Sequence, residues 1–194
     1  ELGDGAVDEQ LEDWLAVGSS PIYVGMGSMP IQSPEQTLAT ITDVVRRLGV
    51  RAIVSTGWSR LTRSAAGSGS DDVHVVGAVD HAALLPRCRA AVHHGGAGTT
   101  HASLSAGLPT MICSVFADQP FWGARVERLK VGAHVPFAQL DATRLRTGFE
   151  TLLAAATVER AADLGVRLRA EQPAAAIAAE LLERTIVLLG DGLD

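Results

Sequence analysis

The sequence has few aromatic residues, few cysteines and no cluster of basic residues. Phe, Trp and Tyr make up 4% of the 194 residues, so a hydrophobic core must be built from aliphatic side chains. Two cysteines, Cys88 and Cys113, are too few for a disulfide framework, and we expect a reducing, cytoplasmic location. Lys and Arg number 16 against 22 Asp and Glu, and the net charge of −6 disfavours nucleic acid and anionic membrane surfaces as partners.

Long apolar runs are also missing. The longest apolar-rich segment, 174–189, is interrupted by Glu180, Glu183 and Arg184, which predicts a packed helix and no membrane span. Hydrophobic residues make up 47% of the chain, which is typical of a globular protein, and the length corresponds to one domain, 1–194. The chain begins at Glu1 without an initiator methionine, and we expect a processed product or part of a longer protein.

The hydrophobic spacing predicts strands that alternate with helices. Strands are expected at 21–26, 50–55, 73–76, 90–93, 110–115 and 131–137, and helices at 8–17, 34–48, 81–86, 99–106, 118–130 and from 141 almost to the end. Ser33 and Asp118 are the expected N-caps of two of these helices. The alternation implies parallel strands with right-handed crossovers, and thus a doubly wound, Rossmann-like α/β sheet that binds ligands at the carboxyl ends of its strands.

The segment 91–100, AVHHGGAGTT, carries the clearest chemical signal. It places three glycines within four residues between an apolar strand and a helix. Glycines allow a positive φ and a close approach of the backbone to a ligand. The first N–H groups of the helix, together with its dipole, then act as about half a positive charge, which favours a phosphate or diphosphate. Thr99 and Thr100 could add hydroxyl donors, and His94 an imidazole N–H, or a positive charge if its pKa is raised.

This segment fits neither of the two common phosphate fingerprints. A P-loop requires a lysine after its last glycine, and none is present. The dinucleotide fingerprint requires a third glycine where this chain has His101, and it belongs after the first strand and not the fourth. A dinucleotide-dependent oxidoreductase is therefore disfavoured, and the residues alone leave the nucleotide open.

Two stretches resemble a known family. The segment 93–135, HHGGAGTTHASLSAGLPTMICSVFADQPFWGARVERLKVGAHV, resembles the donor-binding C-terminal half of the GT-B glycosyltransferases, and PIYVGMGSM at 21–29 is similar to the first strand and turn of the same half. The pattern is most similar to the bacterial antibiotic, macrolide and sterol branch of the UDP-glycosyltransferase superfamily (family 1). The resemblance implies that the N-terminal acceptor domain lies outside this chain, in cis or as a partner subunit.

The resemblance also implies a role for particular residues in binding a nucleoside diphosphate sugar. The turn at 77–80, GAVD, replaces the Trp-x-Pro-Gln stretch that plant members place against uracil, so the donor is expected to be either a UDP-sugar or a TDP-sugar. The implied ligands are His94, Gly96, Gly98 and Thr99 for the diphosphate, Ser28 for the same phosphates from the other side, Val79 and Trp58 for the base, and Asp118 and Gln119 for the sugar hydroxyls.

The resemblance implies an inverting glycosyl transfer to a small lipophilic or natural-product acceptor, without a metal or other cofactor. The histidine that serves as base in the family has no counterpart in this chain, so no catalytic residue is expected here. A stand-alone donor subunit of a two-chain enzyme and a non-catalytic sugar-nucleotide sensor are the alternatives. His93 and His101 are expected to be structural, and a metal site built from the three histidines is disfavoured because no carboxylate lies at ligand spacing.

Overall fold

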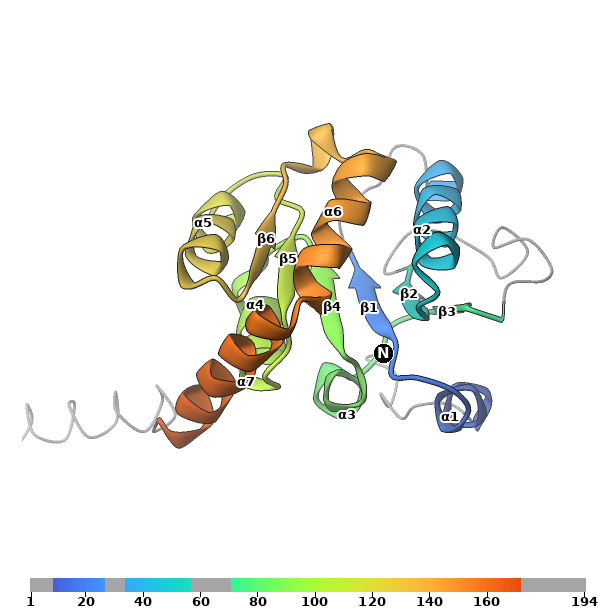
Figure 1. Cartoon of the computed structure of the whole chain (residues 1–194), viewed down its shortest axis with the longest axis horizontal. Coiled ribbons are helices and arrows are strands. Elements are labelled where there is room, and N and C mark those ends of the chain that lie inside the picture. The colour runs from blue at the N-terminus through green and yellow to red at the C-terminus, as the bar shows by residue number, and fades with distance from the viewer. Residues whose placement is uncertain (1–8, 27–33, 57–70, 172–194) are drawn as a thin grey trace, which may run out of the picture.

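The six strands form one parallel sheet. The computed structural model describes residues 9–26, 34–56 and 71–171, and the strand order is β3-β2-β1-β4-β5-β6 (Figure 1). The strands are β1 (Ile22–Gly25), β2 (Ala52–Ser55), β3 (Val73–Val76), β4 (Ala90–His93), β5 (Thr110–Ile112) and β6 (Gly132–His134). The predicted doubly wound α/β fold is therefore confirmed.

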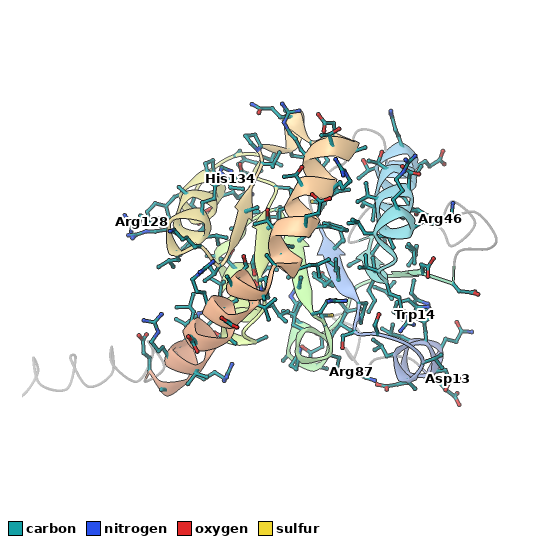
Figure 2. The ribbon with its side chains drawn as sticks, in the orientation of Figure 1. Asp13, Trp14, Arg46, Arg87, Arg128 and His134 are labelled. Carbon is teal, nitrogen blue, oxygen red and sulfur yellow. The ribbon has the colours of Figure 1, made fainter. Side chains whose placement is uncertain are left out.

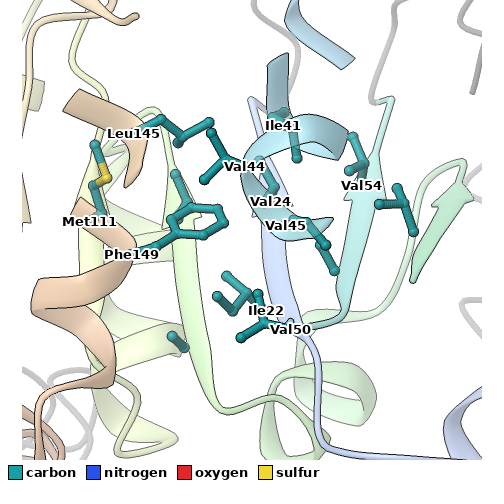
Figure 3. Packing of buried hydrophobic residues seen from close by; sticks show 14 of the residues in the cluster. Ile22, Val24, Ile41, Val44, Val45, Val50, Val54, Met111, Leu145 and Phe149 are labelled. Atoms are coloured by element: carbon teal, nitrogen blue, oxygen red, sulfur yellow. The ribbon is translucent and has the colours of Figure 1, made fainter. Parts of the chain in front are cut away.

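Helices cover both faces of this sheet. They are α1 (Glu9–Ala16), α2 (Pro34–Leu48), α3 (His81–Leu84), α4 (Ala97–Ser105), α5 (Gln119–Leu129), α6 (Ala142–Leu153) and α7 (Ala155–Ala170), with 3₁₀ turns η2 (Leu85–Arg87) and η3 (Phe137–Gln139). Helices α2 and α6 pack on one face, where Ile22 meets residues such as Phe149 (Figure 3). Helices α1, α3, α4 and α5 lie on the other face, against residues such as Tyr23 and Ile112. Neighbouring residues of β1 thus point to opposite layers, as the alternation of a strand requires.

The strand register aligns a row of residues at the carboxyl edge of the sheet. Gly25 at the end of β1 lies opposite Ser55 of β2 and His93 of β4. His93 in turn lies opposite Ile112 of β5, which lies opposite His134 of β6. The chain order reverses between β1 and β4, so the loops after these strands diverge and leave a crevice that is the usual ligand position in such sheets.

Helix α7 packs against α4 through two glycines. A Cβ atom on Gly165 would lie 2.6 Å from the Cα atom of Gly107, which follows α4 with a φ of +77°. Gly107 needs to be glycine because other residues rarely adopt this conformation. The backbones of α7 and of the turn after α4 are therefore in direct contact.

Some predicted boundaries were wrong. The fifth and sixth strands end at Ile112 and His134 and not at 115 and 137. The helix predicted from 141 is two helices, separated at Ala154, whose backbone is extended. The Ser33 cap and the segment 174–189 lie outside the described residues. None of the helices within the described ranges is long and apolar enough to cross a membrane.

The end of α5 generates a stability prediction. Lys130 follows the helix with a left-handed φ of 55°, a conformation that costs a non-glycine residue about 1 kcal/mol. Lys130→Gly should therefore raise the free energy of unfolding by up to about 1 kcal/mol, measured by urea denaturation. Arg128→Gly, within the exposed part of the same helix (Figure 2), should instead lower it by about 1 kcal/mol. Equal effects at the two positions would contradict the assignment of strain to Lys130.

Candidate functional site

The turn between β4 and α4 exposes the start of a helix. Gly96 is the N-cap residue of α4 and supplies no side-chain cap. The first N–H group bonded within the helix is that of Thr100, which donates to the Gly96 carbonyl at 2.9 Å. The N–H groups of Ala97, Gly98 and Thr99 precede it and have no carbonyl partner within a regular helix. Since Ala97 and Gly98 are exposed, these donors are accessible from the carboxyl edge of the sheet.

The three glycines of this turn differ in how closely other atoms surround them. Gly95 has a φ of +92°, and a Cβ there would lie 2.6 Å from Cγ2 of Ile112. A Cβ on Gly96 would lie 2.6 Å from Nε2 of His94, so that this glycine makes room for the imidazole. A Cβ on Gly98 would meet no atom within 4 Å, so no close contact among the described residues requires glycine there. The space above Gly98 is open to a ligand.

His94 lies at this turn with one ring nitrogen unused. Its Nδ1 atom is the one buried side-chain nitrogen or oxygen among the described residues that has no hydrogen-bond partner. Burial lowers the pKa of His94, His81 lowers it further, and Asp118 opposes both. Of the two alternatives for His94, an N–H donor or a positive charge, these surroundings favour the N–H donor. Near neutral pH the ring is uncharged, and what it offers a ligand is an N–H donor.

His93 differs from its neighbour in being fully buried. Its Nδ1 accepts the N–H of Gly95 at 3.1 Å, and its Nε2 lies 3.2 Å from the hydroxyl of Ser103. Burial lowers the pKa of His93 to about 3, with a smaller contribution from His94. The expected structural role fits this environment, whereas His101, expected to be a packing residue, is exposed on α4.

The two threonines of the turn are not equivalent. Thr100 is buried, and its hydroxyl donates back to the Gly96 carbonyl at 2.9 Å. The expectation that Thr100 offers a hydroxyl to a ligand is therefore wrong, because a side chain in that orientation bonds within its own helix. Thr99 is only partly buried and stays beside the open N–H groups.

The loop after β5 brings Asp118 close to the same turn. Asp118 is exposed, and its Oδ2 accepts the indole N–H of Trp122 at 2.8 Å. The predicted N-cap position of Asp118 at α5 is confirmed, but its side chain makes no cap hydrogen bond. The preceding Ala117 has a left-handed φ of 56°, an uncommon conformation for a residue with a Cβ. The hydrogen bond from Trp122 thus uses one of the two carboxylate oxygens of this exposed side chain.

Gln119, the next residue, supports this loop from inside. It is buried, and its Oε1 accepts the N–H of Val115 at 2.7 Å and of Phe116 at 3.2 Å. Both donors occupy the oxygen, so only the amide NH₂ group remains for a ligand. Gln119 could therefore donate to a sugar hydroxyl but not accept from one.

Val79 lies in the turn between β3 and α3. Its partly buried side chain packs against the cluster around Tyr23 and Leu84. The turn is fixed by Asp80, whose carboxylate accepts the N–H of Ala82 at 2.8 Å. The side chain of Val79 thus contributes to the core, and its backbone faces the carboxyl edge of the sheet.

A pairing that the sequence did not reveal lies next to this turn. The hydroxyl of Tyr23 on β1 lies 2.8 Å from Nε2 of His81 on α3. Burial raises the pKa of Tyr23 to about 12, so the phenol stays protonated. A Cβ on Gly25 would lie 2.2 Å from this hydroxyl, which shows how closely the phenol covers the end of β1. The only sequence signal was a lone tyrosine within an apolar strand.

The predicted ligand residues that the structure describes lie on three loops, each of which follows a strand of the sheet. His94, Gly96, Gly98 and Thr99 lie at the β4–α4 turn, Asp118 and Gln119 at the β5–α5 loop, and Val79 at the β3–α3 turn. Ser28 and Trp58 lie outside the described residues. No group of three His, Cys, Asp or Glu side chains suited to a metal ion occurs in the described part of the chain.

The β5–α5 loop also borders a groove on the side of α2 and α6. The groove has a volume of about 800 Å³ and is lined by residues that include Thr40, Ser114, Phe137, Asp141 and Leu145. The backbone of Ser114 accepts the N–H of Phe137 at 2.8 Å, which fixes one wall. One loop therefore contributes both to this groove and to the region near His94.

The fold and the open turn together define a doubly wound α/β domain whose helix α4 begins with an exposed turn and no side-chain cap. A family model for erythromycin biosynthesis protein CIII-like C-terminal domains matches residues 39–188. An uncharacterized glycosyltransferase of Mycobacterium leprae is 44% identical over 178 residues, which cover 92% of this chain and 42% of the relative. The chain belongs to this family of C-terminal domains of GT-B glycosyltransferases.

Two further matches agree with this assignment. A sterol 3-beta-glucosyltransferase of Arabidopsis thaliana is 41% identical over 145 residues, or 74% of this chain and 22% of the plant protein. The solved structure of the glycosyltransferase VinC in complex with DTDP has the same fold, with a TM-score of 0.72 at 23% identity over 88% of this chain and 43% of VinC. The chain thus spans less than half the length of these relatives.

The buried imidazole of His93 predicts a loss of stability in acid. Below its ordinary pKa of 6.5 the unfolded chain binds a proton there, while the folded chain stays neutral down to about pH 3. Its contribution is therefore complete above pH 6.5 and is lost as the pH falls. Between pH 7 and pH 5 the free energy of unfolding should fall by about 2 kcal/mol more in the native chain than in His93→Asn. Denaturant titrations at the two pH values measure this, and an equal fall in both proteins would contradict a neutral His93.

Proposed function

We propose that this chain is the donor-binding domain of a glycosyltransferase and that it binds the diphosphate of a nucleoside diphosphate sugar at the start of α4. The observation that carries the proposal is the uncapped, exposed first turn of α4, which lies beside a histidine whose Nδ1 has no partner. A helix start of this kind attracts a phosphate through its free N–H groups and its dipole.

In this proposal each of the three loops binds one part of the nucleoside diphosphate sugar. The N–H groups of Gly98 and Thr99 and the imidazole of His94 bind the diphosphate, while Gly96 makes room for that imidazole. The free oxygen of the Asp118 carboxylate accepts from sugar hydroxyls, and the amide of Gln119 donates to them. The backbone of the turn at Val79 holds the base in this proposal.

For the base of the donor we propose two candidates, and for the acceptor only a chemical class. The DTDP in the VinC structure supports a TDP-sugar, and the similarity to a plant sterol glucosyltransferase is compatible with a UDP-sugar and a lipophilic acceptor. Both donors therefore belong in the binding test described below.

The reaction proposed for the whole protein is a direct displacement. The oxygen of an acceptor hydroxyl attacks the anomeric carbon, the bond from that carbon to the diphosphate oxygen breaks, and the configuration inverts. The hydroxyl proton passes to a base in the acceptor half. The leaving diphosphate gains negative charge at the start of α4, where fixed N–H dipoles stabilise it without a metal ion.

Exposed apolar residues support the presence of an acceptor half, in cis or as a partner subunit. Phe116 is 58% exposed, Phe121 53% and Val115 48%, and all three lie on or next to the β5–α5 loop. A contiguous group of exposed large apolar side chains is typical of a surface that is covered by another protein or by an apolar ligand.

The proposal is tested by calorimetry of the chain with UDP and with TDP, each with and without a chelator. We expect binding of at least one nucleotide that persists with the chelator. His94→Ala should weaken it by about 1.5–3 kcal/mol, the range for a hydrogen bond to a charged group. His101→Ala, at an exposed position of the same helix, is the matched control and should leave the affinity unchanged. Failure of both nucleotides to bind would overturn the proposed function, and binding that vanishes with the chelator would overturn its metal-free part.

A second test, at Gly98, distinguishes an effect on nucleotide binding from an effect on the stability of the fold. Replacing this glycine by alanine should raise the free energy of unfolding by about 0.5 kcal/mol, because alanine favours the helix and meets no atom there. The same Cβ would occupy the space above the helix start, so Gly98→Ala should weaken nucleotide binding. Calorimetry and thermal unfolding of the same variant measure both effects. A variant that is more stable and binds as tightly as the native chain would place the nucleotide elsewhere.

A further inference from the structure

The β4–α4 turn contains a buried donor that needs a partner. Gly95 is buried, and its left-handed backbone directs its N–H back toward the strand that precedes it. An unpaired N–H in such a place would destabilise the turn. The partner is Nδ1 of His93, two residues earlier in the chain, at 3.1 Å.

The other side of the His93 ring is fixed as well. Its Nε2 lies 3.2 Å from the hydroxyl oxygen of Ser103, and that hydroxyl donates to the Thr100 carbonyl at 3.1 Å. The oxygen of Ser103 also accepts from the Thr110 hydroxyl at 3.1 Å, and its second lone pair can accept from Nε2–H. With a proton on Nε2 and the ring neutral, Nδ1 is left as an acceptor for Gly95.

These contacts join three parts of the site. His93 ends β4, Gly95 forms the turn, and Thr100 and Ser103 belong to the first two turns of α4. The ring thus connects the strand directly to the helix whose first N–H groups are open. The neighbouring ring of His94, which follows the end of β4, lies 6.3 Å away at 72°, and its Nδ1 has no hydrogen-bond partner among the described residues.

We propose that His93 is a positioning residue for diphosphate binding: its neutral ring sets the peptide at Gly95 and thereby the direction of the N–H groups that start α4. This inference rests on the proposed function and adds a residue that would never touch the ligand. It distinguishes the two adjacent histidines by role, with His94 toward the ligand and His93 inside.

The test compares two replacements of His93 in the full 194-residue chain. His93→Leu introduces an apolar side chain of similar size and thereby removes the acceptor. His93→Asn keeps an acceptor, because an asparagine side chain readily accepts the N–H two residues later. The probes are UDP, TDP and the matching nucleosides, which lack phosphate, titrated into variants that circular dichroism shows to be folded.

We expect His93→Leu to lower the affinity for UDP and TDP about tenfold, as for the loss of one hydrogen bond. The affinity for the nucleosides, which is weaker, should stay unchanged. His93→Asn should restore most of the diphosphate affinity. A folded His93→Leu variant with native diphosphate affinity would overturn the proposal, and so would an equal loss for nucleosides and diphosphates, which indicates general damage.

A ligand-free measurement keeps this proposal separate from the proposed function. Nitrogen-15 NMR of the native chain should show His93 protonated on Nε2 and unprotonated on Nδ1, with a coupling across the hydrogen bond to the N–H of Gly95. If the native chain binds no nucleotide, or if His93→Leu does not fold, this pattern still supports the role of His93 in setting the turn. A proton on Nδ1 would overturn it in every case.

Discussion

The backbone N–H groups at the start of α4 are the feature on which the rest of the site depends. A helix cannot satisfy its first N–H groups internally, and most helices cover them with a side-chain cap. Here the N-cap residue is Gly96, which has no side chain, and the residues that follow are exposed. The order of the strands places this helix start at the point where the loops diverge, so an anion can approach it from the carboxyl edge of the sheet.

Two adjacent histidines at the end of β4 differ in burial and in hydrogen bonding. His93 is the last residue of β4, and His94 follows it with its ring 6.3 Å from that of His93. One ring is buried and fully bonded, and the other is half-buried with a free nitrogen.

The sequence was sufficient to predict the fold and the open turn, because apolar strands and a cluster of glycines are local signals. It failed where side chains choose among partners in three dimensions. Asp118 stands at a cap position, but Trp122 one helical turn later supplies an indole N–H for its carboxylate. Thr100 bonds to its own helix, which its position in a glycine-rich turn did not reveal. The Tyr23–His81 pair joins residues 58 positions apart and depends on how α3 packs against β1.

The contact between Gly107 and Gly165 has a mechanical consequence. No side chain lies between the two backbones, so a displacement of α7 cannot be absorbed by a rotamer change. A displacement of α7 would instead move the C-terminal end of α4, which is the end opposite Gly96. Helix α7 is thereby a rigid support for the end of α4 that lies opposite Gly96, and the contact is made by two residues without side chains.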